Sequence, residues 1–244
     1  MAIMKSYLVM RRLITILLIF YFLYVSFGNA TEQHVTTITR NDNNGPYAMI
    51  KDGQCLLKEG DLVVRLNRDP TSQFIKNFNQ HDKSFSHSGI VLYDKGCPYI
   101  YHIINGEENH DNKLRRDSLS RFCDPRRNMA YGIFRYDMNA DEIKKMKDCI
   151  HKWYAQGVQF DFAFNLASDD SMYCSEMISK ALAEATNKRI LIKPTKLTTG
   201  EASLFSAYTH LPFTYANRLK VIPIDALYTN SFCHLVKKYN YEKR

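Results

Sequence analysis

The stretch Met172-Tyr173-Cys174-Ser175-Glu176-Met177-Ile178 decides how this chain is expected to fold. It opens a segment in which apolar side chains stand at positions 177, 178, 181, 182 and 185, the spacing of one buried helical face. The residues before it, Ala167 to Ser171, are typical of a loop. The sequence therefore predicts that Cys174 lies at, or just inside, the N-terminus of a helix.

A cysteine in that position is a candidate nucleophile. The free N–H groups and the positive end of the helix dipole stabilise an anion, so a thiolate of Cys174 is favoured there. Such a thiolate attacks carbonyl groups when a histidine stands beside it. The alternative is that Cys174 is a small buried apolar residue, as most cysteines outside disulfides are.

Residues 1–30 have the pattern of a secretory signal. Lys5, Arg11 and Arg12 precede the apolar run 13–27, and the small residues 28–30 resemble a cleavage site. The run is shorter than the roughly 20 residues of a spanning helix, but an uncleaved anchor is the alternative. Either case places the rest of the chain outside the cytoplasm, in the periplasm or secreted. A buried helix of a cytoplasmic protein would show a polar face, and this segment shows none.

We expect residues 31–56 to be a polar, irregular leader and residues 57–244 to be a single domain. Residues 1–30 carry three basic residues and no acidic one, so their removal lowers the net charge from +8 to +5. This charge suits an anionic envelope polymer or a membrane surface. It does not suit nucleic acid, because Arg115-Arg116 and Arg126-Arg127 are isolated doublets in expected loops.

The six cysteines contain no C-x-x-C pair, and no Cys/His cluster has zinc-ligand spacing, so no metal site is expected. Export would permit disulfides, and their pairing stays open.

Two short strands each carry a histidine. Residues 86–93 form a β-rich run with His87 at its entrance, residues 94–98 supply a turn, and residues 99–104 form a second run with His102. The two runs predict an antiparallel hairpin. Whether the two imidazoles share a face depends on a register that the sequence leaves open.

The other expected elements follow from local pattern. They are a strand at 62–66, a helix starting near 69–73 and capped by Thr71 or Ser72, loops over 105–128, a strand at 130–136, a helix at 140–154 capped by Asn139, a strand at 218–222 and a terminal turn or helix starting at 223–228.

Together these segments resemble the YiiX/YebB-like hydrolases of the NlpC cell-wall peptidase superfamily. The motifs that carry the resemblance are Gly60-Asp61-Leu62-Val63, Ser72-Gln73, Ser86-His87-Ser88-Gly89-Ile90, Phe160-Asp161, Tyr173-Cys174-Ser175-Glu176 and the segment Pro223 to Tyr228. The resemblance implies an α+β, circularly permuted papain-like fold, in which an antiparallel sheet is packed with helices.

The resemblance also implies roles for three residues. Cys174 is the nucleophile, His87 is the base, and His102 matches the orienting position, where these relatives often carry glutamate. A neutral imidazole holds the tautomer of His87 but stabilises its charged form less than a carboxylate does. Glu107 and Glu108 are alternatives for that third role.

Two further residues are expected near the site. The resemblance suggests that Gln73 donates to an oxyanion, with a surface helix residue as the alternative. The backbone N–H of Cys174 is a second oxyanion donor. Tyr173 is expected to line the pocket or to pack in the core. Glu176 is interpreted as structural, because its charge offsets the helix dipole.

The expected function is that of an exported cysteine hydrolase that cleaves an amide bond, in peptidoglycan or a related envelope peptide, without metal or organic cofactor. One alternative is a thioesterase or acyltransferase acting on lipid or fatty-acyl substrates, and another is a non-catalytic binding module. The expected partners are a peptide, a peptidoglycan fragment or an acyl substrate, with membrane-surface contact and no nucleic acid. The sequence leaves the oligomeric state open.

Overall fold

The computed structural model describes residues 45–106 and 109–242. The predicted signal at 1–30 lies outside these residues, as do Glu107 and Glu108. Asn44–Arg244 form one compact unit. Within the described ranges, no helix combines the length and apolar character that crossing a bilayer requires.

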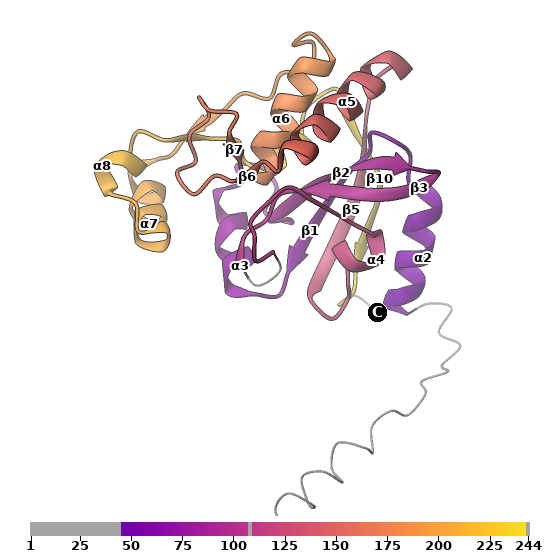
Figure 1. The fold of residues 1–244 in the computed structure, drawn as a ribbon. Coiled ribbons are helices and arrows are strands. Elements are labelled where there is room, and N and C mark those ends of the chain that lie inside the picture. Colours follow the sequence, from indigo (N-terminus) through magenta and orange to yellow (C-terminus); the bar gives the residue numbers. More distant parts are fainter. Residues whose placement is uncertain (1–44, 107–108, 243–244) are drawn as a thin grey trace, which may run out of the picture. The chain divides into compact units, whose positions relative to one another are not determined.

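Six strands form an antiparallel sheet in the order β10-β5-β1-β2-β3-β4 (Figure 1). They are β1 (Leu62–Asn67), β2 (His87–Asp94), β3 (Cys97–His102), β4 (Arg115–Asp117), β5 (Asn128–Tyr136) and β10 (Cys233–Asn240). Every residue of β1 is buried, because β1 has neighbours on both sides and helices cover both faces of the sheet.

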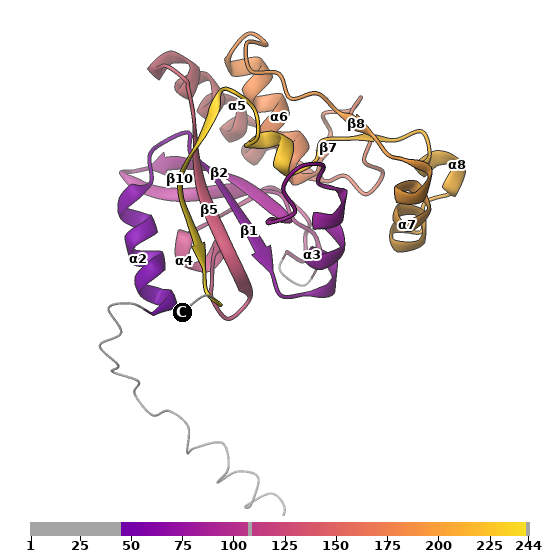
Figure 2. The same ribbon diagram turned by 180° about the vertical axis from the view of Figure 1, so that it is seen from behind.

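Helices α5 (Ala140–Gln156) and α6 (Cys174–Ala185) cover one face of the sheet, and α2 (Pro46–Leu56) and α4 (Leu119–Phe122) cover the other (Figures 1 and 2). Successive strand residues point to opposite faces. Leu62 and Val64 accordingly pack with α5 and α6, whereas Val63 packs with α2 and α4. This arrangement confirms the predicted α+β fold with an antiparallel sheet packed with helices.

Helix α6 begins where the sequence predicts, at Cys174. Tyr173 is its extended N-cap residue, and the carboxylate of Glu176 accepts a hydrogen bond from the Tyr173 backbone N–H at 3.2 Å. This capping contact agrees with the structural role expected for Glu176. Helix α5 also matches its prediction, with Asn139 and Glu142 forming a reciprocal capping box.

Strands β2 and β3 form the predicted hairpin, with Val91 opposite Ile100 and Asp94 opposite Cys97. The two turn residues, Lys95 and Gly96, have φ values of 50° and 81°, as the tightest hairpin turns require. This register places His87 and His102 on the same face of the sheet, since Gly89 and His102 lie across from one another.

Three local predictions were wrong. Residues 46–56 form α2 instead of an irregular leader, and this helix belongs to the compact unit. The region 105–128 holds β4 and α4 in addition to loops. Helix α3 (Pro70–Ile75) is capped by Asp69, whose carboxylate accepts from the Ser72 backbone N–H, instead of by Thr71 or Ser72.

A small helical segment lies between α6 and the last strand. It contains α7 (Thr199–Thr209) and α8 (Phe213–Ala216), flanked by the paired strands β8 (Thr195–Lys196) and β9 (Lys220–Val221). Strand β9 covers only two of the five residues of the strand expected at 218–222. Both views place α7 and α8 at the end of the unit far from α2 (Figures 1 and 2). Their inner side chains form a separate apolar cluster with Phe78 of the 3-10 turn η1 (Lys76–Phe78).

Candidate active site

A cavity of about 450 Å³ opens where β2, α6 and the α7–α8 segment meet. Both Cys174 and His87 line it. His87 is the first residue of β2 and Cys174 is the first residue of α6, so each lies at the end of its element, where a side chain reaches the rim. The structure therefore brings the predicted nucleophile and the predicted base to one cavity.

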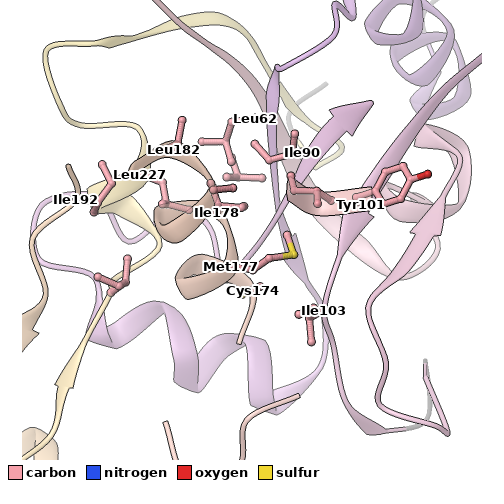
Figure 3. Packing of buried hydrophobic residues seen from close by; sticks show 14 of the residues in the cluster. Leu62, Ile90, Tyr101, Ile103, Cys174, Met177, Ile178, Leu182, Ile192 and Leu227 are labelled. Carbon is pink, nitrogen blue, oxygen red and sulfur yellow. The ribbon is translucent and has the colours of Figure 1, made fainter. Parts of the chain in front are cut away.

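Cys174 is 9% exposed and belongs to the buried cluster that includes Met177, Ile178 and Ile103 (Figure 3). Burial raises the pKa of its thiol. Hydrogen bonds from the side chain and backbone of Ser88, and from the backbone N–H groups of Cys174 and Ser175, offset only part of that rise. The thiol is therefore protonated at neutral pH. Desolvation therefore opposes the thiolate that the helix N-terminus was expected to favour.

His87 and His102 are joined directly. Nε2 of His87 lies 2.9 Å from Nδ1 of His102, and both imidazoles are almost fully buried. The ring of Phe122 on α4 packs against both, with centroid separations of 5.5 Å and 4.9 Å. His102 thus lies within hydrogen-bonding distance of the predicted base, and its orienting role stays a prediction.

Asp117 stands behind His102, and the sequence did not point to it. Nε2 of His102 lies 3.1 Å from Oδ2 of Asp117, whose Oδ1 accepts from Arg115 at 2.7 Å. Burial acts to raise the pKa of Asp117, but the hydrogen bond from His102 and the charge of Arg115 outweigh it and lower that pKa to about 2. The sequence had suggested that the Arg115-Arg116 doublet lies in a solvated loop. Instead, Arg115 lies on β4 and contacts Asp117.

An ionised Asp117 can only accept a hydrogen bond, and this sets the tautomers of both histidines. His102 must carry its proton on Nε2, which leaves Nδ1 as an acceptor. His87 then donates from Nε2 to His102, and Nδ1 of His87 is the basic nitrogen.

Both imidazoles are neutral at pH 7. Burial lowers the pKa of His87 well below 6.5, and the nearby charge of Arg65 lowers it further. Arg65 lies directly across from His87 in the β1–β2 pairing and donates to the Phe122 carbonyl at 2.6 Å. Burial likewise lowers the pKa of His102, to about 4. A neutral His87 is competent to take a proton.

Gln73 does not reach the cavity. Its amide nitrogen donates to the Asn67 carbonyl at 3.0 Å and to the Met129 sulfur at 3.4 Å. Both amide hydrogens are thereby used, so the expectation that Gln73 donates to an oxyanion is wrong for this structure.

Tyr173 both lines the cavity and packs in the core. It is 5% exposed, its ring lies 5.1 Å from that of Phe164, and its hydroxyl accepts from the Ile222 backbone N–H at 2.8 Å. The two expectations for Tyr173 therefore hold together. The alternatives to His102, Glu107 and Glu108, lie outside the described residues.

All six cysteines are free thiols in the structure. Among residues 45–106 and 109–242, no group of three His, Cys, Asp or Glu side chains converges so as to hold a metal ion. His87, His102 and Asp117 form a hydrogen-bonded series instead of surrounding one point.

A similar fold has been solved. The crystal structure of metalloprotein yiiX from Escherichia coli O157:H7 superposes with a TM-score of 0.60 and 18% sequence identity, covering 75% of this chain and 97% of that one. The uncharacterized protein YiiX of Escherichia coli K12 is 22% identical over 133 residues, which are 54% of this chain and 60% of the relative.

The family assignment rests on a longer match. Residues 56–223 match the family described as permuted papain-like amidase enzymes, YaeF/YiiX, C92. The matched region runs from the end of α2 past β9 and includes Cys174, His87, His102 and Asp117. This chain belongs to the permuted papain-like amidase family and is an enzyme of the cysteine hydrolase type.

Proposed function

We propose that Cys174 and His87 hydrolyse an amide bond through an acyl-enzyme intermediate, with His102 and Asp117 as positioning residues. One observation carries the proposal: the cavity that Cys174 lines also receives His87, whose ring is held by the hydrogen-bonded series to Asp117. A nucleophile, a base and an oriented partner of the base are the groups that this chemistry requires.

The reaction starts from a neutral thiol and a neutral imidazole. Nδ1 of His87 takes the thiol proton as the sulfur of Cys174 attacks the carbonyl carbon. The oxygen becomes an oxyanion, and the backbone N–H groups at the start of α6 are its donors. His87 then gives its proton to the amine, the C–N bond breaks, and a thioester remains.

Water completes the cycle. His87 removes a proton from a water molecule, the hydroxide attacks the thioester carbonyl, and the carboxylic acid leaves as the thiolate is reprotonated. The protonated His87 formed in each half-reaction is stabilised through His102 by the charge of Asp117. This compensates for the neutral imidazole at position 102, because the carboxylate that the resembled relatives often carry there is supplied by Asp117, the next residue in the hydrogen-bonded series.

For the substrate, we propose an amide in peptidoglycan or a related envelope peptide as the first candidate. Its support is the net positive charge and the signal-like pattern of residues 1–30, from which we propose that the protein is exported. N-terminal sequencing of the protein recovered from an envelope or secreted fraction tests this: a start at Thr31 supports export, and a start at Met1 in cytosol opposes it.

An apolar acyl group is the second candidate, and the cavity favours it. Seven phenylalanine and tyrosine side chains line the cavity, together with five isoleucines; the aromatic residues are Phe78, Phe160, Phe162, Phe164, Tyr173, Phe205 and Tyr208. Such a lining favours a fatty-acyl chain over a polar stem peptide.

The test uses one panel of amides that share a leaving group and differ in the acyl part: a long-chain acyl, an acetyl and a peptidoglycan stem peptide. The parent should hydrolyse at least one of them, and Cys174→Ser should fall to the uncatalysed rate. Cys97→Ser, at an exposed cysteine, is the matched control and should keep full turnover. Hydrolysis by Cys174→Ser at the parent rate would sink the assignment, and inactivity of a folded parent on every amide would favour a binding module.

A further inference from the structure

The α7–α8 segment presents apolar side chains to solvent. Among the described residues, four of the nine exposed large hydrophobic side chains lie on α7 and α8, namely Leu204, Tyr208, Phe213 and Tyr215. Leu204 on α7 is 60% exposed and Phe213 on α8 is 43% exposed, although the inner side of the same helices is packed. A concentration of exposed apolar side chains at one end of a domain indicates an interaction surface.

The strands beside these helices carry uncompensated positive charge. Lys193, Lys196, Arg218 and Lys220 are all exposed, and among the described residues none of the four forms an ion pair. The one acidic residue between positions 190 and 222 is Glu201, which is bonded to Thr198 in the capping box of α7. The cations therefore face solvent without a counter-charge.

The pairing of β8 with β9 brings two of these cations close together. Lys196 and Lys220 are directly opposite one another in the antiparallel pair, where like charges destabilise. Their neighbours Thr195 and Val221 turn inward, so both ammonium groups lie on the outer side. Arg218, two residues before Lys220, shares that side because Leu219 between them is buried in the inner cluster. An anionic partner would relieve the repulsion.

We infer that the surface formed by Leu204, Phe213, Tyr215, Lys196, Arg218 and Lys220 binds an anionic lipid bilayer. Apolar and aromatic side chains insert at the boundary between headgroups and acyl chains, and basic side chains beside them pair with anionic headgroups. A soluble polyanion would need the cations but would leave Leu204 and Phe213 unexplained. Tyr208, which borders the catalytic cavity, lies one helical turn from Leu204, so the cavity opens beside the bound lipid.

The test reads insertion at α8 in the full chain, in the Cys174→Ser background. Phe213→Trp puts a fluorophore on the surface, and the parent, whose one tryptophan is the buried Trp153, gives the background. Tyr154→Trp, at an exposed position on α5, is the matched control. Vesicles of phosphatidylcholine alone, or of equal parts phosphatidylcholine and phosphatidylglycerol, carry brominated acyl chains that quench a tryptophan within the bilayer.

We expect the Phe213→Trp emission to shift to shorter wavelength and to be quenched several-fold more by the phosphatidylglycerol vesicles, while the Tyr154→Trp emission stays constant. Lys196→Glu with Lys220→Glu should abolish that quenching, and added salt should weaken it. Equal quenching in both variants, or none in Phe213→Trp, overturns the inference. An emission shift caused by soluble polyphosphate alone, or by protein concentration without lipid, would assign the surface to a polyanion or to a second copy instead.

Because these variants lack the thiol, the result does not depend on turnover. If chains that keep Cys174 do not hydrolyse amides but the vesicles still quench Phe213→Trp, the proposed function fails and the lipid surface stands. If those chains hydrolyse amides but the vesicles do not quench Phe213→Trp, the lipid surface fails and the proposed function stands.

Discussion

Nε2 of His102 lies 3.1 Å from Oδ2 of Asp117, so the imidazole that contacts His87, the proposed base, is itself held by a carboxylate. Asp117→Asn would keep the shape but remove the charge, and its amide could donate to His102 and reverse both tautomers. His87 would then present a proton instead of a lone pair to Cys174. We expect kcat to fall by roughly 10²–10⁴-fold, as for losing the base itself, with little change in KM. Steady-state kinetics with His87→Ala alongside measures both, and an unchanged kcat in Asp117→Asn contradicts the relay.

The surroundings of His102 decide which substitutions it tolerates. A glutamine at position 102 can accept from His87 and donate to Asp117, so His102→Gln should retain much of the parent turnover. His102→Glu would place a second buried carboxylate beside Asp117, and it should lose both activity and stability. Turnover and urea unfolding of the two variants and of His102→Ala test this. If His102→Glu proves as active and stable as His102→Gln, Asp117 does not contact that position as described.

The sequence predicted the parts of this site that depend on local pattern. The apolar spacing after Cys174 marks one helix, and two β-rich runs around the turn residues 94–98 mark the hairpin that brings His87 to His102. Asp117 could not be found in this way. It reaches His102 because β4 pairs with β3, with Arg115 across from His102, after a connection that has no periodic signal.

Tertiary contacts explain the other errors. Helix α2 lacks a side-chain cap, and it packs on the sheet, where the Tyr131 hydroxyl donates to the Met49 carbonyl at 2.6 Å. Such a helix is held by its contacts more than by its own sequence. The orientation of Gln73 likewise depends on the carbonyl of Asn67, which the sequence does not place near it.

The resting state of Cys174 can be measured directly. Burial raises the pKa of its thiol, so alkylation by iodoacetamide should be slow at neutral pH and should accelerate as pH rises through the alkaline range. Peptide mapping by mass spectrometry separates Cys174 from the exposed Cys55 and Cys97. A rate for Cys174 that is already maximal at pH 6 would instead demonstrate a standing thiolate–imidazolium pair.

Acid should destabilise the fold in a defined window. The pKa of His102 falls from its ordinary 6.5 to about 4 on burial, so between these values the unfolded chain binds more protons than the folded one. The free energy of unfolding therefore decreases as pH falls from 6.5 to 4, by on the order of 3 kcal/mol from this residue. Asp117, with a pKa lowered to about 2, adds its own loss only at lower pH.

Urea unfolding across that window measures the slope, and His102→Gln is the matched control. The variant lacks the titrating ring, so its stability should depend less steeply on pH between 6.5 and 4. Equal slopes in the two proteins would show that folding does not lower the pKa of His102.

Gly89 provides the space in which the two histidines meet. A Cβ at this position would lie 2.5 Å from Cγ2 of Ile100, 3.0 Å from the Tyr101 carbonyl oxygen and 3.2 Å from Cβ of His102. Gly89→Ala must therefore push β3 away from β2 and carry His102 with it. We expect a loss of roughly 1–3 kcal/mol in the free energy of unfolding, as for an overpacked core, together with a fall in kcat.

Gly200→Ala is the control, since nothing lies within 4 Å of the added methyl group and the position is helical. Gly200→Ala should leave turnover unchanged, and the free energy of unfolding should stay the same or rise slightly. Urea denaturation and turnover of both variants decide the matter: parental values for Gly89→Ala would mean that the close approach of β2 and β3 is not what holds His102 against His87.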